Sequence, residues 1–133
     1  MKEELLKLQD NAYAPYSDFK VSCILIMKDG TKFNGVNVEN ASYGASICAE
    51  RVAITSAICS GYKKGDFKEL YVMTDRNKMG TPCFACRQVI SEFFDFDAKI
   101  ICISQSGETR EYLVKELCPF PFSEDDLKWR VVL

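Results

Sequence analysis

Three cysteines and one glutamate are the residues of this sequence whose types and spacing could do chemistry. Cys48 and Glu50 stand two apart in ASYGASICAERVAI, and Cys83 and Cys86 stand three apart in TPCFACRQVI. Both stretches begin runs typical of a helix, and helix N-termini stabilise thiolates through their free N–H groups and macrodipole. Two such helix starts side by side would present three thiolates to one metal ion. Zinc is the natural choice for soft thiolates in a tetrahedron.

Three protein ligands leave the fourth position of a tetrahedral zinc open for water, which is typical of catalytic sites. Zinc lowers the pKa of that water far enough to give hydroxide near neutral pH. Glu50 is too close to Cys48 to be a comfortable fourth ligand, but its carboxylate could lie beside the water as a proton shuttle. Arg51 and Arg87 each follow a motif residue. Both are candidates to hydrogen-bond the sulfurs and offset their charge.

The sequence contains no histidine. This excludes mechanisms that depend on an imidazole, including serine and cysteine triads of the usual kind. A Cys-x-x-Cys spacing also occurs in redox sites and in structural zinc sites, so both stay as alternatives. We expect the other cysteines to be reduced, small core residues; they are Cys23, Cys59, Cys102 and Cys118.

Length and composition indicate one compact domain over residues 1–133, with 47% hydrophobic and 27% charged residues. The net charge is −2 and the basic residues are scattered, which argues against nucleic acid as a partner. The N-terminal MKEELLKLQDNA is a charged amphipathic segment without the apolar region of a signal peptide. No stretch approaches the roughly 20 apolar residues of a membrane span. We therefore expect a cytoplasmic protein without membrane contact.

The elements that would position these residues alternate along the chain. We predict helices over 3–12, 48 to about 60, 83 to about 94 and within 118–129, and strands over 20–28, 31–38, 68–75, 98–105 and within 107–117. Asp29-Gly30 would join the first two strands as a hairpin. Strands that alternate with helices after a hairpin imply crossovers, which predicts an α/β fold with a five-stranded mixed sheet. Gly35 inside the second strand suggests a bulge.

Nearly end to end, the chain resembles the small homotetrameric, zinc-dependent cytidine deaminases. The matching stretches, in one order, are AYAPYSDFKV, DGTKFNGVNVENASYG, ICAERVAI, PCFACRQVISEF and ELCPFPF. The resemblance implies a three-layer α-β-α fold, one zinc ion per chain and active sites shared between four subunits. It also implies hydrolytic deamination of cytidine and deoxycytidine to uridine and deoxyuridine plus ammonia, in pyrimidine salvage.

The resemblance also implies a role for individual residues. Cys48, Cys83 and Cys86 match the zinc ligands, and Glu50 matches the proton shuttle that serves the water, the ring nitrogen and the leaving amine in zinc deaminases generally. Arg51 lies beside the ligands. The positions that match substrate contacts are Phe19 on the pyrimidine ring, Asn37, Val38 and Glu39 at the ribose, Ala49 at the base edge, and Tyr43 and Phe122, which a neighbouring subunit would contribute.

Two departures from the family pattern concern the pocket. Phe84 stands between two ligand cysteines where glycine is usual, and we expect its ring to pack outward. Cys118 and Phe120 replace a leucine and a smaller residue at the expected subunit boundary. The alternatives are a deaminase of a related aminopyrimidine nucleoside, such as the blasticidin S deaminases, and a structural zinc module of a binding protein.

Overall fold

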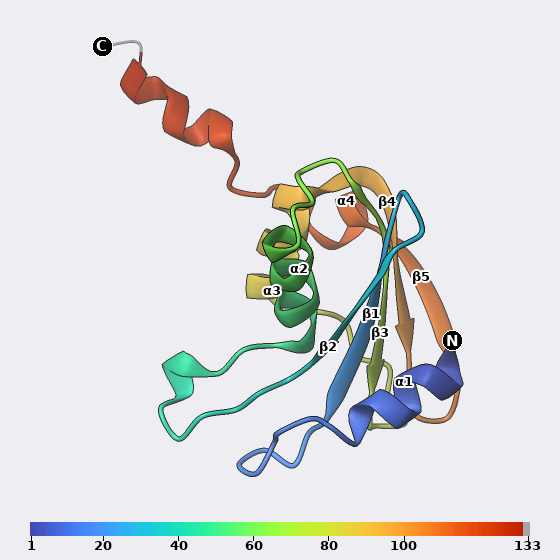
Figure 1. Ribbon diagram of the computed structural model, residues 1–133. Helices are drawn as coiled ribbons and strands as arrows, with labels where there is room; N and C mark the ends of the chain where they lie inside the picture. Colours follow the sequence, from blue (N-terminus) through green and yellow to red (C-terminus); the bar gives the residue numbers. More distant parts are fainter. Residues whose placement is uncertain (132–133) are drawn as a thin grey trace.

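The computed structural model describes residues 1–131, which form a five-stranded mixed sheet in the order β2-β1-β3-β4-β5 (Figure 1). Its strands are β1 Val21–Met27, β2 Lys32–Val36, β3 Phe67–Thr74, β4 Phe94–Ile103 and β5 Thr109–Leu113. β3 and β4 are parallel, and the other neighbours are antiparallel. The predicted α/β class, hairpin and mixed sheet are confirmed.

Helices cover both faces of the sheet and give three layers (Figure 1). On one face lie α2 Ala49–Cys59, α3 Phe84–Phe93 and α4 Val114–Leu117, and on the other lies α1 Lys2–Gln9. Leu5 of α1 is fully buried. It belongs to a small apolar cluster between α1 and the sheet, with Ile24, Met73, Ile101 and Ile103. The larger core lies between the sheet and α2–α4. β1 and the second halves of β3 and β4 are nearly continuous apolar runs, which suits strands covered by layers on both faces.

The sheet meets α2 at Gly35, where backbone approaches backbone. A Cβ at this position would lie 2.1 Å from the Ala49 carbonyl oxygen and 2.9 Å from the Ala53 amide nitrogen. Gly35 pairs in regular register with Cys23, so the bulge expected here is wrong. The glycine is needed because it lets the start of α2, with Cys48 and Glu50, lie directly on the sheet.

Several boundaries differ from the prediction, for local reasons. β4 begins at Phe94, directly after α3, rather than at residue 98. Only the first part of 107–117 is a strand, because Val114 and Leu117 are three apart and bury the same face of the short helix α4. Glu116 caps that helix by accepting the Leu113 amide hydrogen at 2.8 Å. The predicted C-terminal helix is present as a 3₁₀ segment, η2 Glu124–Val131, directed away from the body (Figure 1).

The four cysteines outside the metal motifs divide into two kinds. Cys23 and Cys102 are fully buried, as predicted, whereas Cys59 is exposed and Cys118 is half-buried. The core prediction is therefore wrong for the last two, because Cys59 ends α2 and Cys118 follows α4. All seven cysteines are free within residues 1–131. Among the described helices, none has the length and apolar character to cross a membrane.

Candidate metal centre and active site

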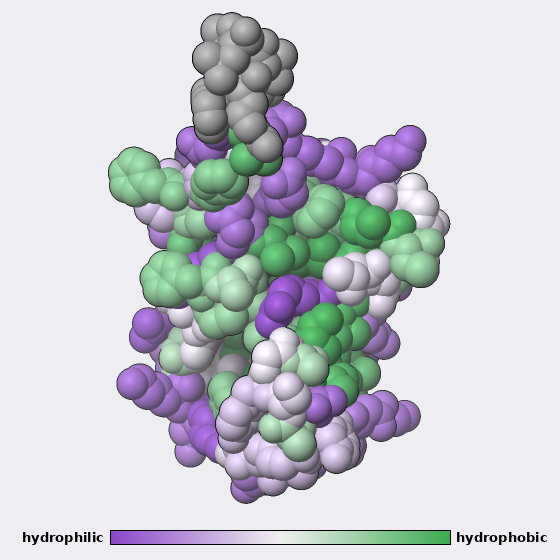
Figure 2. Space-filling model, turned by 90° about the vertical axis from the view of Figure 1, so that its left-hand side faces the viewer, coloured by the Kyte–Doolittle hydropathy of each residue, from purple (hydrophilic) through white to green (hydrophobic). Residues whose placement is uncertain are grey.

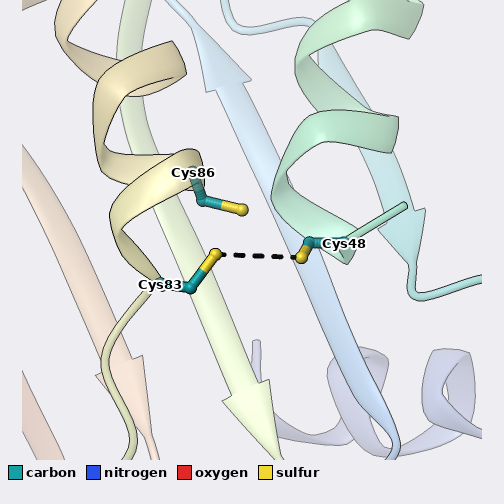
Figure 3. Close-up of side chains that lie close together, drawn as sticks. All are labelled: Cys48, Cys83 and Cys86. Carbon is teal, nitrogen blue, oxygen red and sulfur yellow. Dashed lines mark hydrogen bonds between the residues drawn. The ribbon is translucent and has the colours of Figure 1, made fainter. Parts of the chain in front are cut away.

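The three predicted metal ligands come together where two helices begin. Cys48 is the N-cap of α2, Cys83 is the N-cap of α3, and Cys86 lies in the first turn of α3. The extended backbone of each N-cap residue directs its side chain toward the facing helix start, and all three sulfurs point to one another (Figure 3). Their ligand atoms lie within 4.8 Å of one another, and the Cys48 and Cys83 sulfurs are 4.0 Å apart.

This cluster fits a zinc ion. Zn–S bonds of about 2.3 Å in a tetrahedron place the sulfurs about 3.8 Å apart, close to the observed 4.0 Å between Cys48 and Cys83. The set provides three soft donors, which leaves one of four tetrahedral positions for another group. It is the one group of potential ligands of this kind among residues 1–131.

The surroundings of the cluster favour a thiolate at Cys48. Hydrogen bonding with the Cys86 thiol, followed by Arg51, lowers the pKa of Cys48 to about 5. Arg51 donates from Nη2 to the Cys48 sulfur at 3.4 Å. The same coupling raises the pKa of the Cys86 thiol, because Cys48 accepts its hydrogen. Arg51 therefore occupies the place that the sequence predicted, beside the negative sulfurs.

The prediction that Arg87 also hydrogen-bonds a sulfur is wrong. Arg87 donates to the carbonyl oxygens of Pro82 and Leu117 and to the Thr81 hydroxyl, at 2.7 to 3.1 Å. Its guanidinium also stacks on the Phe84 ring, 4.5 Å from the centroid. Arg87 therefore joins the loop before Cys83 to the end of α4, and its donors are used on oxygen rather than sulfur.

Glu50 lies in the first turn of α2 with only 4% of its surface exposed. Burial raises the pKa of its carboxyl to about 7, and the adjacent Cys48 thiolate adds to the rise. A carboxyl with such a pKa can accept and release a proton near neutral pH. Glu50 shares a pocket with Cys48 and Cys83, so proton transfer and metal binding can occur at one place.

That pocket has a volume of about 190 Å³. Its walls come from β1, β3, α2 with its N-cap, the residue after β2, and the segments before β1 and α3. The lining residues are Phe19, Val21, Asn37, Cys48, Ala49, Glu50, Val72, Thr74, Gly80, Thr81 and Cys83. A larger hollow, about 670 Å³, lies between residues 119–125 and the junction of α3 with β4. It contains none of the three clustered cysteines, so the smaller pocket is the candidate site.

Three of the predicted substrate contacts, Phe19, Asn37 and Ala49, line the pocket. The Asn37 amide also fixes the backbone beside it, donating to the Phe19 carbonyl at 2.7 Å and accepting the Val21 amide hydrogen at 2.9 Å. The structure thus brings the aromatic ring and the amide to the same wall as Glu50.

The other predicted contacts lie outside the pocket lining found in the described chain. Glu39 accepts the amide hydrogens of Tyr16 and Ser17 at 3.0 and 3.1 Å, and the Ser17 hydroxyl lowers the pKa of the Glu39 carboxyl. Val38 forms a bridge that joins two loop segments. Tyr43 is 75% exposed and Phe122 is 58% exposed, and neither contacts this pocket.

The sequence reasoning missed the wall formed by the end of β3 and the loop that follows. Thr74 and Gly80 meet there, and the Thr74 hydroxyl is buried without a hydrogen-bond partner in the described part of the chain. The signal was weak, because these residues have no chemistry-bearing pattern. Phe84 is 77% exposed and is absent from the pocket wall, so the expectation that it packs outward is confirmed for the described chain.

Comparisons with known proteins agree on one family. Residues 1–103 match the family model described as the cytidine and deoxycytidylate deaminase zinc-binding region. The chain is 39% identical over 125 residues to a cytidine deaminase of Halalkalibacterium halodurans, covering 94% of this chain and 93% of the relative. It is 43% identical over 120 residues to a probable cytidine deaminase of Dictyostelium discoideum, covering 90% and 79%.

A solved structure gives the same result for the fold. The crystal structure of cytidine deaminase from Burkholderia pseudomallei superposes with a TM-score of 0.86 at 40% identity, covering 90% of this chain and 94% of that one. The described family is zinc-binding, and the donor set at Cys48, Cys83 and Cys86 fits that metal.

Proposed function

Because the chain belongs to the cytidine and deoxycytidylate deaminase family, we propose that it deaminates cytidine and deoxycytidine hydrolytically. The products are uridine or deoxyuridine and ammonia. The observation that carries this proposal is the buried Glu50 carboxyl beside three clustered cysteines in one pocket. A structural zinc module has no use for a buried carboxyl with a raised pKa at its metal site.

Cys48, Cys83 and Cys86 hold the zinc, and Arg51 offsets their negative charge. When bound, zinc makes water a sufficiently strong nucleophile near neutral pH to attack carbon 4 of the base. Glu50 takes one proton from the attacking water and delivers it to the ring nitrogen. It then takes the second proton, from the hydroxyl now on carbon 4, and delivers it to the amino group, which leaves as ammonia while the carbonyl forms. Its pKa of about 7 allows both directions of transfer. The backbone at Ala49 and the Glu50 carboxyl read the base edge.

Phe19 packs on the pyrimidine ring, and Asn37 with Val38 and Glu39 holds the ribose. The half-buried side chain of Asn37 already lines the pocket. Glu39 has to exchange its hydrogen bonds with Tyr16 and Ser17 for those of a sugar hydroxyl. A carboxylate at this place suits a neutral diol and repels a 5′-phosphate. Free nucleosides are therefore favoured over nucleotides and nucleic acids.

The active protein is a homotetramer in which each site takes residues from a neighbour. Exposed aromatic side chains support this, because Tyr43, Phe122 and Phe120 are 75%, 58% and 95% exposed. The face that α2 and α3 turn away from the sheet also gathers apolar side chains (Figure 2). Ile58 of α2 and Phe84 of α3 are both exposed apolar side chains. Apolar patches of this kind mark interfaces. Tyr43 and Phe122 then complete the pocket of a neighbouring subunit.

Residues 1–133 act as one catalytic domain in pyrimidine salvage, and the protein works in the cytoplasm. The seven cysteines form no disulfide within residues 1–131, which is the usual arrangement in proteins of reducing compartments. The five strands share one sheet, and the residues of the pocket come from segments between 19 and 83, which supports a single unit.

A substrate panel tests the proposal. The purified protein is given cytidine, deoxycytidine, cytidine 5′-monophosphate or blasticidin S, and the change of ultraviolet absorbance is followed. We expect turnover of both nucleosides and little of the nucleotide. Turnover of blasticidin S but not of cytidine would identify a related aminopyrimidine nucleoside as the substrate. Bound zinc without turnover of any of the four would favour the structural zinc module.

A further inference from the structure

We propose that Arg76 is a positioning residue of the substrate pocket, which holds the Phe19 ring in place for the pyrimidine. The inference rests on the proposed function, in which Phe19 packs on the base. Arg76 lies two residues after the end of β3 at Thr74, outside the pocket wall. It therefore acts on substrate only through another side chain.

The contacts of Arg76 lead to Phe19 from two sides. The guanidinium carbon lies over the Phe19 ring, 5.1 Å from its centroid. Nη2 donates to the carbonyl oxygen of Asp18, the residue before Phe19, at 3.0 Å. Phe19 is 36% exposed and lines the pocket. One guanidinium thus contacts both the ring and the backbone that carries it, which the planar fork of arginine allows.

Asp75 holds the other side of Phe19. Its carboxylate accepts the Lys20 amide hydrogen at 3.0 Å, and its own amide donates to the Lys20 carbonyl at 3.1 Å. The carboxylate also forms an ion pair with Arg76. The backbone carbonyl of Arg76 accepts the Gln105 amide hydrogen at 2.8 Å, which fixes the pair to the loop after β4. The two adjacent residues therefore hold the chain both before and after the ring.

The backbone turns at Asp18, directly before the ring. Its φ is +55°, in the left-handed region that is uncommon for residues other than glycine, although aspartate adopts it more often than most. That conformation turns the Asp18 carbonyl toward Arg76, which binds it. Without Arg76 the segment loses the partner of this carbonyl, and the Phe19 ring loses its fixed position.

The segment also has internal hydrogen bonds, from the Phe19 amide to the Ser17 hydroxyl and from the Asp18 amide to the Ala14 carbonyl. Two further side chains that hold it, Asn37 and Glu39, are ones that the substrate also uses. Asn37 binds the Phe19 carbonyl, and Glu39 binds the amides of Tyr16 and Ser17. In the proposed function both side chains serve the ribose. Arg76 and Asp75 hold the segment without using the side chains of Asn37 and Glu39. Their contacts can therefore persist while those two side chains bind the ribose.

The test compares steady-state kinetics of the zinc-loaded wild type and Arg76→Gln with cytidine. Loss of the cation–π contact and of a charged hydrogen bond should raise KM roughly tenfold. The value of kcat should change less than about twofold, because α2 and α3 carry Glu50 and the cysteines. Arg76→Lys keeps the charge but not the planar fork of the guanidinium, so its KM should lie between those of the wild type and Arg76→Gln.

Arg110→Gln is the matched control. Arg110 is also an exposed arginine that pairs with an acidic neighbour, with 56% of its side chain exposed against 48% for Arg76, but it lies on β5. Its KM should equal that of the wild type. A thermal melt and the zinc content of each variant show that all are folded. If Arg76→Gln fails to fold, the comparison of Arg76→Lys with wild type decides.

A double-mutant cycle separates positioning from a general structural effect. In a Phe19→Ala background, Arg76→Gln should raise KM by less than about twofold, since the ring through which it acts is gone. An unchanged KM in Arg76→Gln, or the same tenfold rise in both backgrounds, overturns the inference. Absence of turnover by the wild type would instead overturn the proposed function.

Discussion

Replacement of Gly35 by alanine should displace the helix that carries Cys48 and Glu50. The added Cβ would lie 2.1 Å from the Ala49 carbonyl oxygen, where ordinary contact begins at 3.4 Å. The start of α2 must therefore retreat by 3.4 − 2.1 = 1.3 Å along this direction. Backbone atoms of α2 cannot rotate away as a flexible side chain would. The retreat also breaks the 3.0 Å hydrogen bond from the Cys23 thiol to Ala49.

Overpacking in a core lowers the free energy of unfolding by about 1–3 kcal/mol. Because the obstacle is rigid backbone, we expect about 3 kcal/mol for Gly35→Ala. For a domain of this size that lowers Tm by about 10 °C. The zinc content and kcat should fall as well, because Cys48 moves relative to α3. Thermal unfolding and metal analysis measure these effects. Gly44→Ala is the control, since nothing lies within 4 Å of its added Cβ. Equal Tm and equal zinc in both variants would refute the reasoning.

Three further predictions concern single groups of the pocket. The pKa of Glu50 rises from 4.5 to about 7 on folding, so the unfolded state loses this proton first and the contribution of Glu50 to the stability of the zinc-free protein is lost as pH rises through this window. Cys48, whose pKa falls to about 5, contributes with the opposite sign. The Glu50 contribution is about (7 − 4.5) × 1.36, or roughly 3 kcal/mol, and it should appear as the difference between wild type and Glu50→Gln in the change of unfolding free energy from pH 5 to pH 8, measured with urea. Thr74→Val should raise the free energy of unfolding by about 1 kcal/mol, measured by urea unfolding, because it replaces a buried hydroxyl without a partner. Arg51→Gln should weaken zinc binding about 10- to 100-fold in chelator competition, because Arg51 holds the Cys48 sulfur.

For each of these three predictions, one outcome would contradict the physical reason given. The same pH slope in Glu50→Gln would show that other groups cause it. A less stable Thr74→Val protein would mean that the hydroxyl has a partner. Unchanged zinc affinity in Arg51→Gln would remove the electrostatic role of the guanidinium, with Arg110→Gln as the control for loss of a surface charge.

The sequence predicted the parts of the site that depend on local patterns. The positions of Cys48 and Cys83 at helix starts follow from the apolar runs that come after them. The predicted bounds of these two helices agree with those of α2 and α3 to within about one residue. The spacing of Cys83 and Cys86, three apart, placed both on one face of the second helix. These features need no knowledge of which segments lie side by side.

Other features depend on contacts between segments that are distant in the sequence, so local patterns could not predict them. Arg87 resembles Arg51 in its sequence position, but its side chain lies toward Leu117 of α4, thirty residues away. Gly35 appeared to mark a bulge because its contact, Ala49, lies on another element. The segment of the short helix α4 is predicted as strand from the sequence, since four residues give too little periodicity to identify a helix.

The measurement that tests the central claim most directly is cytidine turnover and zinc content of the wild type and of Glu50→Gln in parallel. Glutamine keeps the shape of the side chain but cannot carry a proton between water, ring and amine. We predict about one zinc per chain in both proteins, with turnover in the wild type and at least a hundredfold less in the variant. Equal turnover by both proteins would contradict the assignment of Glu50 as the proton carrier.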